Sequence, residues 1–303
     1  MQNQPQSRES FWTILKLLKW AAAYFKSHHI ENPRATAEVL LAHTLRKERI
    51  DLYVCYDQPL GSEELQHFKT LIKKRIEREP VAYITGGKEF WSIELRVNPD
   101  VLIPRPETEC LVEAVLAQLS GNSDTTPRRI LELGTGSGAI VLALASRLRG
   151  DLFFASDRSI RAVRLAQQNA RRHQVADRIH FFCGDWMKAL KSSGDLFDII
   201  VSNPPYIKTG LIAGLQPEIY RYEPVQALDG GEDGLGCLRL IIDQAHQYLK
   251  DGGRLFLEIG FDQKKSVHDI ITESGNYCEI VFGQDYSGCD RTVAMRKKAA
   301  QKG

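Results

Sequence analysis

The stretch from Ile130 to Ile140, which reads ILELGTGSGAI, decides the fold of this 303-residue chain. An apolar, strand-like run breaks into glycines and then continues as a small-residue helix to about Ser146. Glycines allow positive φ, so such a loop lets a nucleoside-bearing ligand approach the backbone at a helix N-terminus. The residues expected to bind a cofactor here are Gly134, Thr135, Gly136, Ser137 and Gly138. Their spacing also satisfies the dinucleotide fingerprint, so it does not separate NAD from S-adenosylmethionine.

Two further apolar runs end in residues suited to a cofactor. Residues 152–156 are followed by Asp157, a carboxylate placed to bind ribose hydroxyls. Residues 179–183 are followed by Gly184, then by Asp185 and Trp186, a carboxylate and an indole that could hold an adenine ring. Asp157 could instead be only a helix N-cap, and Trp186 only a packing residue. An open α/β sheet binds its ligands at the carboxyl ends of its strands, which favours the cofactor interpretation for the set.

A fourth apolar run, residues 198–202, leads into the turn Asn203-Pro204-Pro205-Tyr206. The side-chain carbonyl of Asn203 and the backbone carbonyl of Pro204 are two acceptors that can converge on one planar NH2 group. Consecutive prolines stiffen the turn, and Tyr206 offers an aromatic face beside the nitrogen. Taken alone, the turn could be an ordinary rigid turn.

The turn predicts the chemistry of methyl transfer to a planar nitrogen. An amide nitrogen becomes more acidic as it attacks a methyl group, so its hydrogen bonds to two carbonyls strengthen in the transition state. We therefore expect Asn203, Pro204 and Tyr206 to be catalytic, with no strong general base. The expected substrate-binding residues are Asn203, Pro204, Pro205 and Tyr206, together with Arg105 and Glu107. The turn does not distinguish a glutamine amide from the exocyclic amine of adenine.

The rest of the chain indicates three parts. Residues 11–26, 34–45 and 62–78 have helical periodicity, which predicts an N-terminal helical domain over residues 1–82. Residues 83–104 alternate in type and predict a β-hairpin linker. Residues 105–303 form an α/β domain, which continues with a helix at 235–249, a turn at 251–253 and a strand at 254–259. A helix at 263–274 and an antiparallel pair of strands at 278–282 and 291–295 complete it.

Composition is compatible with a globular protein without nucleic-acid affinity. Forty Lys and Arg residues balance 38 Asp and Glu residues, so there is no overall basic signature. The six cysteines have no metal-ligand spacing, and we expect no metal. The polar N-terminus and the lack of an 18-residue apolar run predict a cytoplasmic protein without a membrane segment.

With these motifs in view, the chain resembles class I S-adenosylmethionine-dependent methyltransferases. Within them it is most similar to the N5-glutamine methyltransferases of peptide chain release factors, the HemK/PrmC family. Beyond the cofactor motifs, the similarity rests on residues 79–90, 101–109 and 222–234 and on Asp290-Arg291, and it covers most of residues 10–295. The resemblance implies a Rossmann-like seven-stranded sheet, mostly parallel, whose last strand runs antiparallel.

The resemblance also implies an activity. S-adenosylmethionine would be converted to S-adenosylhomocysteine, and the methyl group would pass to the Gln of the Gly-Gly-Gln motif of class-1 release factors, which modulates translation termination. The N-terminal domain would bind the release factor, and we expect a monomer that binds neither a membrane nor, stably, nucleic acid. The segment Arg105-Pro106-Glu107-Thr108-Glu109 is characteristic of the release-factor group.

The sequence leaves four alternative functions open. Sister enzymes that methylate a ribosomal-protein glutamine resemble the chain throughout, and an adenine-N6 methyltransferase would use the same turn. A nicotinamide oxidoreductase is permitted by the glycine loop but leaves the turn without a purpose. A non-catalytic protein that keeps S-adenosylmethionine as a structural ligand is disfavoured by Asn203. Glu218, Tyr222 and Glu223 could contact the substrate or close a lid.

Overall fold

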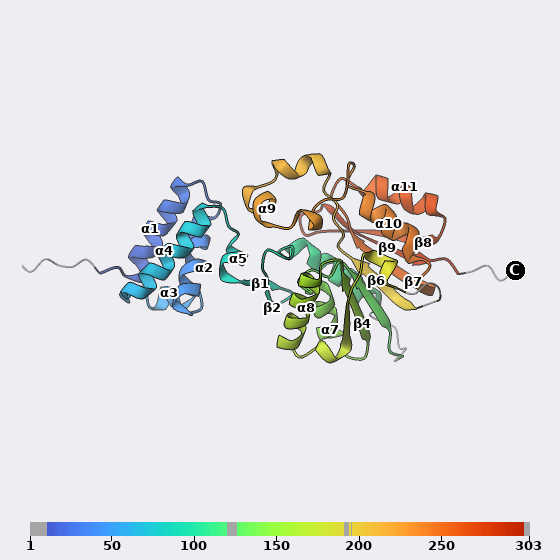
Figure 1. Cartoon of the computed structure of the whole chain (residues 1–303), viewed down its shortest axis with the longest axis horizontal. Helices are drawn as coiled ribbons and strands as arrows, with labels where there is room; N and C mark the ends of the chain where they lie inside the picture. Colours follow the sequence, from blue (N-terminus) through green and yellow to red (C-terminus); the bar gives the residue numbers. More distant parts are fainter. Residues whose placement is uncertain (1–10, 120–125, 191–193, 195, 300–303) are drawn as a thin grey trace, which may run out of the picture. The chain divides into compact units, whose positions relative to one another are not determined.

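The computed structural model describes residues 11–119, 126–190, 194 and 196–299. The chain divides into two compact units, and the division falls between Gly86 and Gly87 (Figure 1). Each unit has its own hydrophobic core, because one cluster of buried residues lies entirely before Gly86 and two others lie entirely after it.

The first unit is helical in the part that the structure describes. Its helices are α1 (Ile14–Ser27), α2 (Pro33–Leu45), α3 (Asp51–Val54), α4 (Ser62–Ile76) and α5 (Val81–Thr85). The three long helices confirm the periodicity, and α1 begins where the Thr13 hydroxyl accepts the backbone N–H of Lys16. Phe25, Leu40 and Phe68 are fully buried between them. The helices α3 and α5 were not predicted, because one turn is too short to show a period.

The second unit is built on a seven-stranded sheet. Its strands are β3 (Arg129–Leu133), β4 (Leu152–Asp157), β5 (Ile179–Cys183), β6 (Phe197–Ser202), β7 (Leu249–Glu258), β8 (Tyr277–Gln284) and β9 (Asp290–Lys297). They follow the order β5-β4-β3-β6-β7-β9-β8. The strand β9 lies between β7 and β8 and is antiparallel to both, whereas the pairs from β5 to β7 are parallel. The predicted mostly parallel sheet is confirmed.

Helices cover both faces of this sheet (Figure 1). They are α6 (Glu109–Leu119), α7 (Ala139–Arg147), α8 (Ile160–Arg172), α9 (Pro217–Tyr222), α10 (Gly236–Ala245) and α11 (Lys264–Ser274), with short 3-10 turns η1 (Pro106–Thr108), η2 (Ala176–Arg178), η3 (Trp186–Ala189), η4 (Thr209–Gly214) and η5 (Val225–Ala227). Successive strand residues point to opposite faces. Accordingly Ile130 packs with α6 and α7, and Leu131 packs with α10 and α11.

The hairpin is shorter than the predicted range 83–104. It consists of β1 (Gly87–Phe90) and β2 (Ile93–Arg96), joined at Trp91 and Ser92 with positive φ. The preceding residues form α5, because Pro80 favours a helix start and Gly86, at φ +74°, ends the helix. Residues 97–104 contain no strand. The hairpin belongs to the second unit.

The stretch before the last three strands also differs from the prediction. The helix α10 ends at Ala245 rather than near residue 249, and residues 249–258 form a single strand. The expected turn at 251–253 is an irregularity inside β7, where the pairing register with β6 shifts. A Cβ on Gly253 would lie 3.1 Å from the Asp198 carbonyl oxygen, so the close approach of the two strands there requires glycine.

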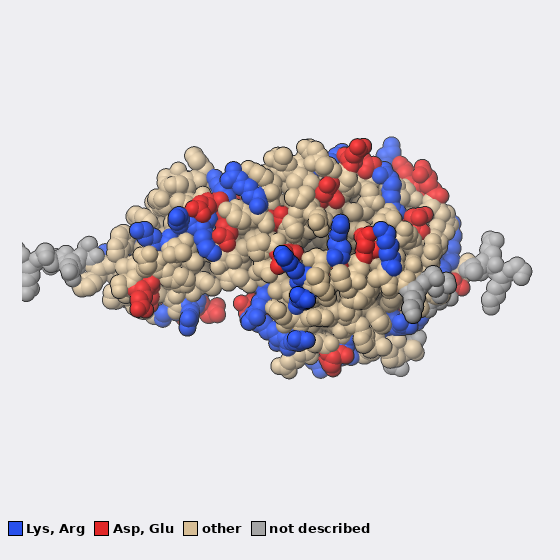
Figure 2. Space-filling model, viewed as in Figure 1, with Lys and Arg blue, Asp and Glu red and all other residues tan. Residues whose placement is uncertain are grey.

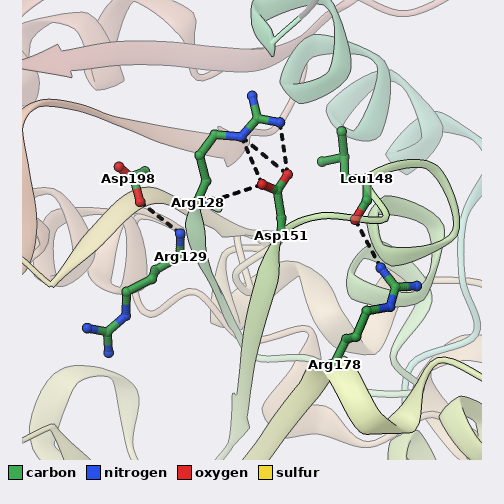
Figure 3. Close-up of polar contacts among 6 residues, drawn as sticks. All are labelled: Arg128, Arg129, Leu148, Asp151, Arg178 and Asp198. Atoms are coloured by element: carbon green, nitrogen blue, oxygen red, sulfur yellow. Dashed lines mark hydrogen bonds and ion pairs between the residues drawn. The ribbon is translucent and has the colours of Figure 1, made fainter. Parts of the chain in front are cut away.

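Ion pairs hold the amino-terminal edge of the sheet (Figure 3). Arg128, before β3, binds both carboxylate oxygens of Asp151, and the backbone N–H of Arg129 donates to Asp198 at 2.8 Å. A cleft of about 230 Å³ at this edge is lined by Arg128, Asp198 and Lys250, among others. Lys250 pairs with Asp198 at 2.8 Å, so these charges are neutralised within the chain. The predicted site residues gather at the opposite, carboxyl edge.

Candidate active site

The glycine loop between β3 and α7 presents its backbone. Gly134, Gly136 and Gly138 all have positive φ, from +54° to +86°. A Cβ on Gly138 would lie 2.8 Å from Leu142 and 3.2 Å from the Ala166 side chain, so glycine here allows α7 and α8 to pack closely. A Cβ on Gly136 would meet nothing within 4 Å, which leaves open space where a ligand can approach the main chain.

The side chains of this loop face inward. Thr135 and Ser137 are both buried, and the Thr135 hydroxyl donates to Oε2 of Glu132 at 2.5 Å. The Glu132 carboxyl also accepts the backbone N–H of Val141 in α7, at 3.3 Å. Burial raises the pKa of Glu132 to about 8, because the charged form loses its hydration. These hydroxyls are therefore turned away from a ligand, and the backbone N–H groups of Thr135, Gly136 and Gly138 also donate within the chain.

Asp157 connects the end of β4 to the glycine loop. Its Oδ2 accepts the backbone N–H of Gly136 at 2.9 Å, and its Oδ1 accepts that of Ser159 at 2.8 Å. The N-cap of α8 is Ser159, whose hydroxyl accepts the N–H of Ala162. Ser159 thus caps α8, whereas Asp157 binds the glycine loop. Burial raises the pKa of Asp157, whereas its two backbone hydrogen bonds oppose that rise.

Trp186 lies beside the glycine loop, whereas Asp185 is directed toward a lysine of η3. The indole ring approaches to 3.8 Å from the position that a Cβ on Gly134 would take, and it also packs against the core that includes α10. Asp185 is half-exposed and pairs with Lys188 at 2.6 Å. The structure therefore brings together Gly134, Gly136, Asp157 and Trp186 from three neighbouring strand ends.

The turn at residues 203–206 follows β6 at the same edge of the sheet. The Asn203 Nδ2 donates to the Thr108 hydroxyl of η1 at 3.1 Å, which fixes the orientation of the Asn203 amide. In the part of the chain that the structure describes, the hydrogen bonds leave the Asn203 carbonyl oxygen and the Pro204 carbonyl open as acceptors. Pro204 is buried and Pro205 half-buried, so the turn is held firmly. This arrangement suits a donor NH2 group.

Tyr206 is held by hydrogen bonds at its hydroxyl and at its backbone carbonyl. Its hydroxyl donates to Oε1 of Glu258 at 3.0 Å, and its backbone carbonyl accepts from Gln263 at 3.0 Å. Burial raises the pKa of Tyr206, and the nearby Glu258 carboxyl adds to that rise. A Cβ on Gly230 would lie 2.8 Å from the Tyr206 Cα, so the glycine-rich loop after η5 packs directly on the turn.

Arg105 and Glu107 come shortly before Thr108, whose hydroxyl accepts from Asn203. Arg105 forms an ion pair with the buried Glu223 at 2.5 Å, and Glu223 also accepts the backbone N–H of Ile103 at 3.0 Å. Glu107 is exposed. Glu223 thus joins residues 103–105 to the end of α9, which accounts for one of the three residues whose roles the sequence left open. Glu218 and Tyr222 lie within α9 itself.

Three residues of the site were not singled out from the sequence. Thr108 holds Asn203, Glu258 holds Tyr206, and Asn169 binds the glycine loop through the Ser137 carbonyl. Glu258 could have been found, because it ends the apolar run Leu255-Phe256-Leu257 in the way that Asp157 ends β4. Burial raises its pKa to about 7, against the opposing influence of the Thr108 and Tyr206 hydroxyls. Thr108 lies in the Arg105–Glu109 segment noted above, although no role was assigned to it, and no local pattern marks Asn169.

The charges near the site are mixed. On the face seen in Figure 2, basic side chains gather over α8, which carries Arg161, Arg164, Arg171 and Arg172. Arg161 pairs with Asp100, and Arg172 pairs with Glu94 of the hairpin. No group of three or more potential metal ligands occurs among the described residues. Within the same residues, no helix is long and apolar enough to cross a membrane.

Comparisons with known proteins agree with this architecture. Two family models match: the PrmC N-terminal domain over residues 16–86 and a methyltransferase domain over residues 125–300. The catalytic domain of hMettl16, solved in complex with a 3′UTR hairpin, superimposes with a TM-score of 0.56 at 17% identity, covering 75% of this chain and 82% of that one. At that identity the likeness supports the fold alone. Fold and family models together define a class I methyltransferase.

The sequence relatives narrow this class. The release factor glutamine methyltransferase of Geobacter sulfurreducens is 41% identical over 290 residues, which cover 95% of this chain and 98% of the relative. The protein of the same name from Rhodopirellula baltica is 36% identical over 292 residues, with 96% and 98% covered. The chain belongs to the family of release factor glutamine methyltransferases.

Proposed function

We propose that this chain transfers a methyl group from S-adenosylmethionine to the side-chain amide nitrogen of the Gln in the Gly-Gly-Gln motif of class-1 peptide chain release factors. Family membership supports the reaction class, and the relatives carry the release factor in their name. The observation that carries the proposal is the orientation of Asn203, whose Nδ2 is bound to Thr108 so that its carbonyl oxygen is left to accept.

The residues at the carboxyl edge fit the methyl donor. The open space at Gly136 lets an amino-acid or ribose moiety approach the main chain of the loop closely, and Asp157 supplies a carboxylate that favours ribose hydroxyls. Trp186, beside Gly134, offers an apolar ring for an adenine. When bound, S-adenosylmethionine supplies an electrophilic methyl group on a sulfonium. We also propose that the Asp185 carboxylate lies at the edge of the bound adenine.

The 203–206 turn would then orient the nucleophile. An amide nitrogen is a poor nucleophile because its lone pair is delocalised, so the site must aim it and stabilise the charge that develops. The Asn203 and Pro204 carbonyls would accept its two hydrogens, and these bonds strengthen as the nitrogen becomes more acidic. Tyr206 would pack against the amide plane and exclude water. The proton can leave an already acidic product, so no strong base is required.

We further propose that the first unit recognises the release factor. The helix α1 and the residue Trp12 before it present a row of aromatic rings: Trp12 meets Trp20 edge to face at 6.0 Å, and Trp20 stacks on Tyr24 at 5.2 Å between ring centroids. Trp12 and Trp20 are each at least 40% exposed. Exposed Trp residues are the type most enriched at the energetic centres of protein interfaces.

Labelled S-adenosylmethionine tests the proposal directly. The purified chain is incubated with a release factor, with ribosomal protein or with DNA, and the transferred label is counted. We expect label only in the release factor, and none when the Gln of its Gly-Gly-Gln motif is replaced by Ala. Label in ribosomal protein or in DNA, with none in the release factor, would refute the substrate assignment while leaving the methyl transfer intact.

A further inference from the structure

The Glu223 carboxylate binds two points of one short segment. Its Oε2 accepts the backbone N–H of Ile103 at 3.0 Å, and its Oε1 pairs with the Arg105 guanidinium at 2.5 Å. The Glu223 side chain is 1% exposed, so water does not compete for either oxygen. Hydrogen bonds between charged groups are short and strong, and here they converge from two directions. Glu223 therefore fixes where residues 103–105 lie.

The segment that Glu223 holds is stiff. Pro104 and Pro106 stand on either side of Arg105. Each proline ring fixes its own φ, and each proline restricts the backbone of the residue before it. Arg105 accordingly has an extended backbone, with φ −95° and ψ 142°. A displacement of Arg105 would therefore be passed along the chain rather than absorbed by it.

Two further hydrogen bonds lead from Arg105 to Asn203. The Arg105 carbonyl accepts the backbone N–H of Thr108 at 3.1 Å, which closes η1. The Thr108 hydroxyl then accepts from the Asn203 Nδ2 at 3.1 Å. If the Asn203 amide were reversed, its NH2 group would face the NH2 group of the substrate, and neither could accept. The position of Thr108 is therefore tied to the orientation that methyl transfer requires.

Glu223 itself belongs to the segment that follows the 203–206 turn. The chain leaves the turn at Ile207 and returns beside it, where the Ile207 N–H donates to the Leu228 carbonyl at 3.0 Å. Between these points, over residues 208–227, the helix α9 buries none of its residues. Glu223 comes directly after α9 and is buried. Its carboxylate thus joins this segment to the one that holds the Asn203 side chain.

We infer that Glu223 is a positioning residue for methyl transfer. It fixes Arg105 and, through the Arg105 carbonyl, Thr108. Thr108 in turn holds the Asn203 amide in the orientation that a planar nitrogen requires. The inference rests on the proposed function for its reaction, because Glu223 acts only through Asn203. Replacement of Glu223 should slow the chemical step without weakening the binding of either substrate.

Steady-state kinetics of Glu223→Gln test this. The variant keeps the shape and one acceptor for the Ile103 N–H, but its NH2 group cannot accept from Arg105. We expect kcat for release-factor methylation to fall by about ten- to hundredfold, the scale of a misplaced reactive group. The KM for the release factor and the affinity for the methyl donor should change by less than about twofold. A variant with at least half of the kcat, or with only a raised KM, would show that Glu223 merely holds residues 208–227.

A double-mutant cycle tests the route through Thr108. Thr108→Val keeps the shape and removes the hydroxyl that accepts from Asn203, so it should also lower kcat. Glu223→Gln added to Thr108→Val should lower kcat by less than about a further twofold, because the route is already broken. Full, independent losses from the two substitutions would overturn the inference. If Glu223→Gln does not fold, Glu223→Asp, which is one methylene shorter, is measured by the same criteria.

Asp151→Asn is the matched control for a lost buried ion pair. Asp151 has a side chain 4% exposed and, like Glu223, accepts one backbone N–H and one guanidinium, both from Arg128 (Figure 3). It lies at the opposite edge of the sheet, so the variant should lower stability and leave kcat unchanged. If Asp151→Asn slows transfer as much as Glu223→Gln, the loss reflects stability alone and the inference falls.

A measurement without substrate separates this inference from the proposed function. The side-chain NH2 signals of Asn203, assigned by their loss in Asn203→Ala, are recorded by 15N NMR. We expect them to shift in Glu223→Gln and in Thr108→Val and to stay in place in Asp151→Asn. Unchanged signals in Glu223→Gln overturn the inference. If the wild-type chain leaves the release factor unlabelled while the signals shift, the proposed function fails and the link from Glu223 to Asn203 stands.

Discussion

The Asn169 side chain of α8 donates from Nδ2 to the Ser137 carbonyl at 2.8 Å and thereby ties the glycine loop to α8. The same amide exchanges two hydrogen bonds with the backbone of Arg96 in β2, at 2.9 and 3.0 Å. Asn169 is fully buried. One side chain thus holds both the hairpin and the loop that is proposed to bind the methyl donor, and it satisfies its own polar atoms in doing so.

Asn169→Ala should therefore lower the free energy of unfolding and weaken methyl-donor binding together. The variant leaves three backbone groups unpaired in the interior, so we expect a loss of about 2–4 kcal/mol. Urea denaturation and calorimetric titration with S-adenosylmethionine measure the two effects. Gln168→Ala, at an exposed neighbouring position on α8, is the control and should change neither. Unaltered donor affinity in Asn169→Ala would show that the loop holds its shape without this bond.

Asn203→Ala should abolish methyl transfer and leave cofactor binding largely intact. The variant removes an acceptor that strengthens in the transition state, and such losses cost at least about a hundredfold in kcat. Single-turnover transfer to the release factor, with donor affinity measured in parallel, separates the two effects. An Ala variant that retains more than about half of the activity would remove Asn203 from the mechanism.

Asp157→Ala should mainly weaken the affinity for S-adenosylmethionine. The carboxylate both fixes the Gly136 amide and, in the proposed complex, accepts from ribose hydroxyls. Ser159→Ala provides the comparison, because Ser159 caps α8 two residues away. Its loss should cost about 1 kcal/mol of stability without altering donor affinity. Equal affinities for the Asp157→Ala variant and the wild type would argue against a cofactor role for Asp157.

Glu132 should make the stability of the chain depend on pH. Burial raises its pKa from 4.5 to about 8, so the folded chain keeps a proton that the unfolded chain releases. The contribution is fully present below pH 4.5 and is lost as the pH rises toward 8. The free energy of unfolding should fall by up to about 1.4 kcal/mol per pH unit in this window. Glu132→Gln should remove that slope in urea denaturation at pH 5 to 8; an identical slope would show that Glu132 is ionised.

Trp20→Ala should raise the KM for the release factor and leave kcat unchanged. Trp20 is 43% exposed and lies in the middle of the aromatic row formed by Trp12, Trp20 and Tyr24. Loss of a central interface Trp costs about tenfold or more in affinity. Lys69→Ala, exposed on α4, is the control. If neither KM nor direct binding of the release factor changes, this face of α1 is not the contact surface.

Much of the second unit could be predicted, because its signals are local. Each of four strand ends combines an apolar run with glycine, carboxylate, indole or amide within a few residues, and a parallel sheet places such ends together. The contacts that orient those residues join distant parts of the chain. Asn203 and Thr108 are 95 residues apart, and Tyr206 and Glu258 are 52 apart. Neither pairing follows from spacing, because only the three-dimensional fold decides which side chains meet.

The hairpin shows that short segments also limit what can be predicted from sequence. Alternation of residue types over 83–104 suggested a β-hairpin across that whole range, whereas Pro80 and Gly86 bound a short helix, Val81–Thr85, that overlaps its start. A four- or five-residue segment has too few positions to separate the two periods. For Asp157, the position at the end of a strand was predicted correctly, but its hydrogen bond to Gly136 was not predicted.

The position of β9 has a consequence for how the chain acquires its structure. Residues 290–297 come last among the strands, yet they lie between β7 and β8 rather than at an edge. During vectorial synthesis on a ribosome, β8 has no partner in the sheet until these residues emerge, and β7 presents an unpaired edge. The half of the sheet that carries Glu258 can therefore close only late, so nascent chains that stop before residue 290 would be prone to aggregate.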